Sequence, residues 1–230
     1  MNQIVTEGII LSRTDFGEAD RILTLLTPDH GKLRLMAKGV RRVKSKLAGG
    51  IELFSVSSIT FVKGRGDIST LVSARLVKHY SHIVEDLDRT MLGYELIKQL
   101  NKATEDHPEP AYFTLLKEVF EALDDFSMPR ELVQFWFAAQ LLRLGGHTPN
   151  LQTDVDGRRL QPGEAYDFDT ENMCFVGPRP HGRFTTNHIK FIRLVFSGSS
   201  PKILLNVQGG LTLLRECVPL VNDLVKSSHI

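Results

Sequence analysis

Seven lysine and arginine side chains lie between residues 32 and 46 of this 230-residue chain, with no carboxylate among them. Cations at this density bind anions, because phosphate oxygens accept their hydrogen bonds and relieve their mutual repulsion. The net charge of the whole chain is only +1, so this positive potential is local. The cluster consists of Lys32, Arg34, Lys38, Arg41, Arg42, Lys44 and Lys46. It predicts a binding surface for nucleic acid, and the alternative is an ordinary solvated basic loop.

The spacing of these cations predicts how they are presented. Leu33, Leu35 and Ala37 alternate with polar positions, as in a strand with one apolar face and one charged face. A basic loop follows as far as Gly49, and Lys63 and Arg65 stand at the next turn. No aromatic residue occurs between residues 32 and 46; Phe16, Phe54 and Phe61 lie around that stretch, and the last two occupy positions typical of core. The pattern therefore predicts contacts to phosphates that are indifferent to base sequence.

Composition limits the class of protein. Residues 1–80 hold 13 Lys and Arg against 7 Asp and Glu, whereas residues 81–150 hold 6 against 12, so the positive charge belongs to the N-terminal part. The N-terminus lacks the pattern of a secretion signal, and no apolar run approaches the roughly 20 residues that span a bilayer. Two distant cysteines, Cys174 and Cys217, provide no disulfide framework. We expect a cytoplasmic protein without a membrane partner.

The sequence pattern predicts that the segments around these cations are strands. Five β-type segments are expected at residues 4–13, 20–27, 31–38, 52–63 and 68–80. The apolar parity changes within the fourth segment, which predicts a β-bulge at Ser57-Ser58. Five short strands with a bulge and no long helix predict a small closed barrel, of which the OB-fold is the common form.

Beyond residue 80 the apolar period becomes helical, so the expected class is α+β. One helix should bury the face formed by Ile83, Leu87, Met91, Tyr94 and Ile97. A later helix, from about residue 127 to 144, is apolar nearly all round and should be the centre of the helical part. Residues 147–184 lose helical periodicity, and helices resume at about 186–196 and 210–226.

Residues 8–54 resemble the N-terminal OB barrel of the RecO family, the bacterial recombination mediators and strand-annealing proteins. The resemblance is most specific in GEADRI at residues 17–22 and AKGVRR at residues 37–42. It implies an OB-fold DNA-binding domain at 1–80 and a helical domain at 81–230. It also implies binding of single- and double-stranded DNA, annealing, and RecA loading together with RecR. The C-terminal tail of single-stranded DNA-binding protein is a further implied partner.

Many RecO-like proteins carry a zinc module with two CxxC pairs, and the matching region here is residues 147–184. The matching positions are residues 153–157 and 174–177, where Cys174 alone remains of the four expected thiolates. Structural zinc needs about four N or S ligands. We therefore expect a degenerate zinc-ribbon-like insertion that binds no metal; the alternative is a site assembled from Cys174 with His147, His181 and His188.

The remaining polar residues suggest binding rather than catalysis. Asp15, Glu18 and Asp20 are expected to pair with the basic strand, and no catalytic constellation or cofactor motif stands out. An acidic tail peptide with an apolar end would need an apolar floor and nearby cations. Candidates for that pocket are Arg193, Leu211, Leu214 and Arg215. The competing interpretations are a general OB-fold RNA-binding protein and a metal-dependent nuclease.

Overall fold

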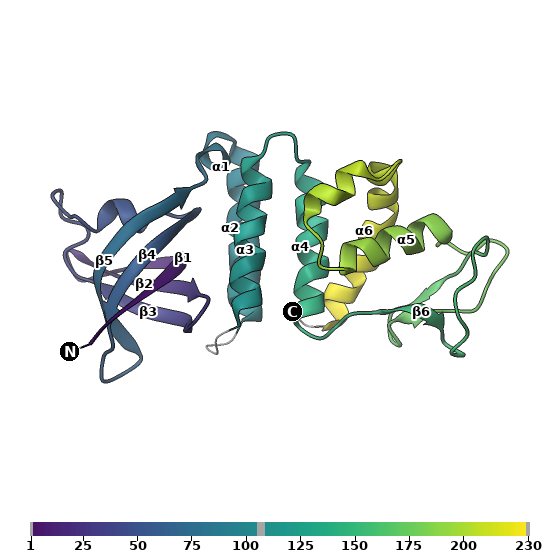
Figure 1. The fold of residues 1–230 in the computed structure, drawn as a ribbon, viewed down its shortest axis with the longest axis horizontal. Coiled ribbons are helices and arrows are strands. Elements are labelled where there is room, and N and C mark those ends of the chain that lie inside the picture. The colour runs from purple at the N-terminus through teal and green to yellow at the C-terminus, as the bar shows by residue number, and fades with distance from the viewer. Residues whose placement is uncertain (1, 105–108, 229–230) are drawn as a thin grey trace. The chain divides into compact units, whose positions relative to one another are not determined.

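A computed structural model describes residues 2–104 and 109–228, and its N-terminal part is a five-stranded barrel (Figure 1). The strands close in the order β1-β2-β3-β5-β4, with β4 paired to β1. The β3–β5 pair is parallel, whereas the other four pairs are antiparallel. The bounds are β1 Gln3–Phe16, β2 Asp20–Thr27, β3 Gly31–Ala37, β4 Ser55–Val62 and β5 Ile68–His79, with a 3-10 helix η1 at Ala48–Gly50. The predicted α+β class and five-stranded barrel are confirmed.

The barrel interior follows the predicted alternation in β3. Leu35 and Ala37 are fully buried in the barrel core, and Leu33 packs against it. Arg34, between them, is exposed on the outer face. Burial of one face therefore fixes the register of β3 and leaves the opposite face polar.

The predicted bulge is present near Ser57, but the extra residue lies on the partner strand. The β4–β5 register shifts between Val56 and Ser57, where Val77 of β5 is skipped. The parity change in β4 has a second cause. Phe54, which has a φ of 53°, turns its ring away from the barrel toward Tyr94 and Phe120, with centroid distances of 5.2 and 5.6 Å.

Three helices complete the first compact unit: α1 Ser81–Glu85, α2 Leu87–Ala103 and α3 Pro110–Asp124. The ring of Phe54 lies against Gly93 of α2, where any Cβ would come within 2.5 Å of it. This unit ends at Asp125, and a second begins at Phe126. The change from strand to helix occurs near residue 80 as expected, but the compact units do not coincide with the predicted domains 1–80 and 81–230.

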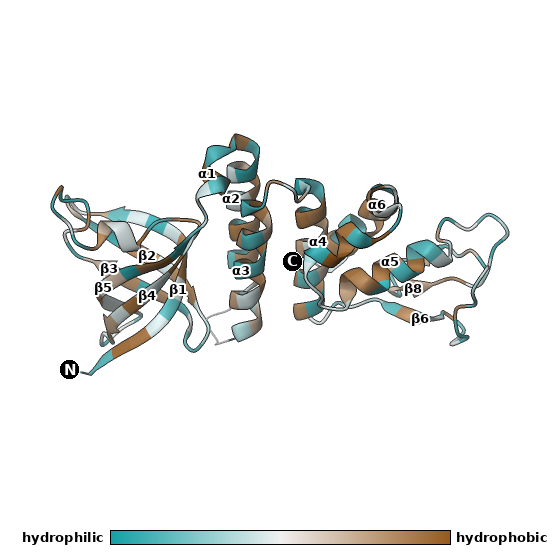
Figure 2. Ribbon diagram, turned by 45° about the horizontal axis from the view of Figure 1, so that its top comes forward, coloured by the Kyte–Doolittle hydropathy of each residue, from teal (hydrophilic) through white to brown (hydrophobic). Residues whose placement is uncertain are grey.

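The second unit is built on α4 Arg130–Leu144, which packs against α5 Thr186–Phe196 and α6 Gly210–Ser228. Trp136 of α4 is buried and donates through Nε1 to the Ser199 carbonyl at 2.8 Å. The prediction that this helix forms the centre is confirmed. Figure 2 shows apolar and polar residues alternating along α5 and α6, as amphipathic helices on one core require. A 3-10 helix, η2 Pro201–Asn206, joins α5 to α6.

Between α4 and α5 lies a small three-stranded sheet in the order β6-β8-β7, within the predicted module 147–184. Its strands are β6 Asn150–Asp154, β7 Phe168–Asp169 and β8 Cys174–Phe175. In residues 2–104 and 109–228, no helix has both the length and the apolar character to cross a membrane.

Candidate functional site

The basic cluster retains five exposed cations that are not engaged by the protein. Within the described residues, their side chains form no ion pair. One stands on the outer face of β3 and the others follow in the loop between β3 and β4. They are Arg34, Lys38, Arg42, Lys44 and Lys46. An uncompensated group of this kind remains available to an external anion.

Lys32 has a different role from the predicted one. Its Nζ donates to the carbonyl oxygens of Asn101, at 3.1 Å, and Thr104, at 2.6 Å. Both carbonyls lie at the C-terminal end of α2, where the helix dipole is negative and carbonyls lack partners within the helix. The ammonium group of Lys32 thus holds α2 against the barrel instead of facing solvent. The sequence could not show this, because the two partners are about 70 residues away.

Arg41 is partly engaged as well. Its Nε lies 3.5 Å from Oδ2 of Asp15, and Arg21 donates to Oδ1 of the same carboxylate at 2.7 Å. The hydrogen bond from Arg21 and the charges of Arg41, Arg21 and Arg13 hold the pKa of Asp15 below its usual value, against a smaller opposing effect of desolvation. Asp15 of the acidic cluster does pair with cations, but these are Arg21 of β2 and Arg41 of the loop rather than the predicted cations of the basic strand. Arg41 is therefore less available to an external anion than the other loop cations.

Two backbone hydrogen bonds attach the start of the basic loop to the turn between β1 and β2. The backbone N–H of Gly39 donates to Oδ1 of Asp20 at 2.7 Å, and that of Arg41 donates to the Ala19 carbonyl at 2.9 Å. The first part of the loop is therefore fixed to the barrel, and the cations that follow extend from this anchor.

Lys63 and Arg65 lie toward the other end of β3. Arg34 of β3 pairs with Ile68 of β5, so the exposed turn that carries Lys63 and Arg65 precedes that point of the barrel. Lys38 directly follows the last residue of β3, whereas Lys63 and Arg65 lie in the turn that precedes β5, at the opposite end of the parallel β3–β5 pair. The cations thus form a track from one end of β3 to the other rather than a single pocket.

The module at 147–184 closes two of its turns with carboxylates, and one of these, Asp154, stands in a segment where the resemblance implied zinc ligands. Oδ1 of Asp154, a buried residue, accepts from the backbone N–H groups of Asp156, at 3.0 Å, and Arg158, at 2.9 Å. Oδ1 of Asp169 accepts from those of Glu171 and Asn172 at 2.9 and 3.1 Å. Rings of Tyr166, Phe168, Phe175 and Phe184 pack together beneath these turns.

The donors present do not fit a zinc ion. Among the residues that the structure describes, no three His, Cys, Asp or Glu side chains converge as metal ligands would. His188, one of the alternative ligands, is held by Thr185 and by Glu216, whose carboxylate lies 2.6 Å from Nε2. Hydrogen bonds and aromatic packing therefore account for this module.

We predict that Asp154→Ala lowers the free energy of unfolding of the second unit by about 1–3 kcal/mol, because two backbone N–H groups lose their hydrogen bonds to this buried carboxylate. Asp156→Ala is the matched control, since its exposed carboxylate forms an ion pair with Arg158 and accepts from no backbone N–H among the described residues. Urea titrations with and without a strong chelator measure both effects. A chelator that itself lowers stability would contradict the carboxylate explanation.

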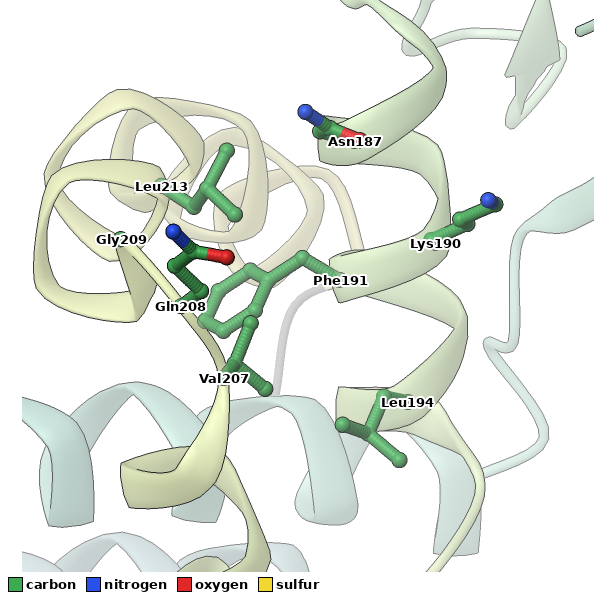
Figure 3. A pocket seen from close by; sticks show the side chains of 8 residues that line it. All are labelled: Asn187, Lys190, Phe191, Leu194, Val207, Gln208, Gly209 and Leu213. Atoms are coloured by element: carbon green, nitrogen blue, oxygen red, sulfur yellow. The ribbon is translucent and has the colours of Figure 1, made fainter.

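The second unit contains a groove of about 580 Å³ between α5 and the start of α6 (Figure 3). Phe191 and Leu194 form its floor from α5, with Leu213 opposite, and Lys190 stands at the rim with its ammonium group turned away from Phe191. The remaining lining residues are Asn187, Val207, Gln208 and Gly209.

The four residues predicted for a tail pocket do not line this groove. Arg193 donates through Nε to the Leu151 carbonyl at 2.8 Å, toward β6, and Leu214 is buried. Leu211 and Arg215 are exposed elsewhere on α6. The sequence does contain a pattern that points to this groove. Residues 187, 190, 191 and 194 are spaced so that they share one face of α5, and that face lines the groove.

Comparison with known proteins covers both units. Residues 1–80 match the family described as "Recombination protein O N terminal", and residues 84–203 match "Recombination protein O C terminal". A protein named DNA repair protein RecO from Dehalococcoides mccartyi is 35% identical over 204 residues, which is 86% of this chain and 80% of that protein. Proteins of the same name from Listeria welshimeri and Listeria monocytogenes are each 28% identical over 197 residues, 83% of this chain and 76% of theirs.

Proposed function

Because this chain belongs to the RecO family of DNA repair proteins, we propose that it binds single- and double-stranded DNA through phosphates and anneals complementary strands. We also propose that it acts with RecR to load RecA on strands coated with single-stranded DNA-binding protein. The observation that carries the DNA-binding part is the set of five exposed cations, Arg34 to Lys46, that the described residues leave without counterions.

The arrangement of these cations suits annealing. Contacts to phosphates fix a strand in position but do not occupy the hydrogen-bonding edges of its bases. A strand held along β3 and the basic loop therefore keeps those edges available to a complementary strand. The linear track between the Arg65 turn and the β3–β4 loop supports an extended ligand over a compact one.

The direct test is annealing of complementary DNA strands coated with their single-stranded DNA-binding protein, with an RNA pair of the same sequence in parallel. We expect faster annealing of the coated DNA than without the protein. Equal affinity for both nucleic acids and no acceleration would favour the general RNA-binding alternative. Magnesium-dependent loss of a labelled strand would instead indicate a nuclease.

The groove between α5 and α6 is our candidate for the C-terminal tail of the single-stranded DNA-binding protein. Phe191, Leu194 and Leu213 offer an apolar floor for an apolar terminal side chain. Gly209 lies at the start of the long helix α6, where the helix dipole is positive, and Lys190 adds a cation at the rim. We propose this groove in place of the pocket predicted from Arg193, Leu211, Leu214 and Arg215, none of which lines it.

We predict that Lys190→Glu weakens binding of an acidic tail peptide roughly 3- to 10-fold, because a rim cation becomes a repelling anion. Lys226→Glu, on an exposed position of α6, is the control with the same change of charge. Fluorescence anisotropy of a labelled tail peptide measures both. Equal weakening by the two variants would move the tail site out of this groove.

A further inference from the structure

Phe16 is an exposed aromatic side chain beside the basic cluster. Its residue is 52% exposed, whereas Phe54 and Phe61 of the same unit are almost fully buried. Within the described part of the chain, its ring makes no aromatic or cation–π contact. Phe16 ends β1 at the turn into β2, the same turn to which Gly39 and Arg41 of the basic loop are hydrogen-bonded.

The strand registers place Phe16 on the outer face of the barrel. Leu23 and Leu35 pair with each other and both point into the core, so Ile22 and Met36, the pair beside them, point outward. Phe16 pairs with Asp20, which has the parity of Ile22. The outer face of β1, β2 and β3 therefore carries an exposed aromatic ring and two half-buried apolar side chains.

Cations border this apolar strip on the same face. Arg34 shares the outward parity of Met36 on β3, and the exposed Lys38 follows the last residue of that strand. Arg42 folds back over Gly39, since a Cβ on that glycine would lie 3.7 Å from Nε of Arg42. Gly39 in turn is bonded to Asp20, the cross-strand partner of Phe16. An aromatic ring with guanidinium and ammonium groups nearby matches the elements that hold single strands, where bases stack on rings and phosphates meet cations.

We propose that Phe16 stacks against an unpaired base of a bound DNA strand, so that this face distinguishes single strands from duplex. The proposal rests on the proposed function and deepens it: it adds base contact to the phosphate track. Only an unpaired base can supply its face to the ring, because in a duplex both faces of each base are covered by neighbouring bases. Stacking reads no hydrogen-bonding edge, so it accepts any base and leaves pairing possible.

The test uses the full chain with Phe16→Ala and Phe16→Trp, and three labelled probes: oligothymidylate, a duplex, and an abasic strand of equal length. Phe16→Ala is expected to weaken oligothymidylate binding on the order of 5- to 150-fold, the effect of removing one stacking ring. Binding to the duplex and the abasic strand should not change. Phe16→Trp, which keeps an aromatic ring, should bind oligothymidylate as well as the unaltered protein does.

Two kinds of result would overturn this proposal, and they separate it from the proposed function. If Phe16→Ala leaves oligothymidylate binding intact, or weakens all three probes equally, Phe16 does not stack on a base, while phosphate binding stands. If the unaltered protein binds none of the probes, the DNA-binding function fails as well. Because Phe16 is exposed, the variants should fold normally. A thermal unfolding curve that matches that of the unaltered protein checks this.

Discussion

Replacing Arg42, Lys44 and Lys46 together with glutamate is expected to lower the affinity for single-stranded DNA at least about 50-fold at about 0.15 M salt. Each lost phosphate contact forfeits the release of about 0.7 counterion, which is worth ~0.8 kcal/mol at that salt concentration. Three contacts therefore account for the change before any repulsion from the new carboxylates is added. These three residues are preferable to Arg41, whose guanidinium is already shared with Asp15.

The salt dependence gives the sharper measurement. Five contacts predict a log–log slope near about −3.5, and removing three should bring it to about −1.4. The control is a triple reversal with the same change in net charge at Lys98, Arg215 and Lys226, exposed positions outside the basic cluster. If that control reduces affinity and slope as much as the test variant, net charge and not this surface governs binding. Losses that depend on base sequence would also contradict a phosphate track.

Phe54→Ala is expected to lower the free energy of unfolding of the first unit by about 3–5 kcal/mol, the usual cost of emptying a buried Phe site. The ring of Phe54 fills the space between Tyr94, Phe120 and Gly93, and its residue is 1% exposed. It therefore joins the barrel to α2 and α3. Urea denaturation followed by circular dichroism measures the effect.

Phe16→Ala is the matched control for this experiment, because it removes the same ring from an exposed position and should change stability by under about 0.5 kcal/mol. A similar loss in both variants would mean that Phe54 does not hold the helices on the barrel. The expected result also bears on the domain boundary. A fragment ending at residue 80 would expose Phe54 and Tyr80, both buried against Phe120 of α3.

Local patterns in the sequence were sufficient for the barrel. The alternation around Leu35 predicted which face of β3 is buried, and the turn and bulge signals predicted the neighbouring strands. The helix from Arg130 to Leu144 could be assigned as the centre of its unit because it is apolar nearly all round. Such patterns depend on neighbours within a few residues, and burial of one face amplifies them into a fixed register.

The predicted buried face of the first helix shows where local pattern fails. Ile83 and Ile97 are buried, as predicted, but Leu87, Met91 and Tyr94 are 76%, 62% and 46% exposed. The segment is interrupted at Asp86, whose side chain accepts from the Arg89 backbone N–H and begins a new helix. The interruption rotates the face that α2 turns to the core. When apolar spacing is counted across a break between two helices, here α1 and α2, it can assign the wrong face of the second helix to the core.

The sequence alone determined that a local excess of positive charge lies on one strand and its following loop, because charge and alternation are properties of consecutive residues. Only the tertiary structure decided which of those cations remain available. Lys32 is taken by the end of α2 and Arg41 by Asp15, through partners that folding brings from elsewhere in the chain. The same holds for the groove at Phe191 and the outward position of Phe16, since the exposure of a side chain depends on what packs beside it.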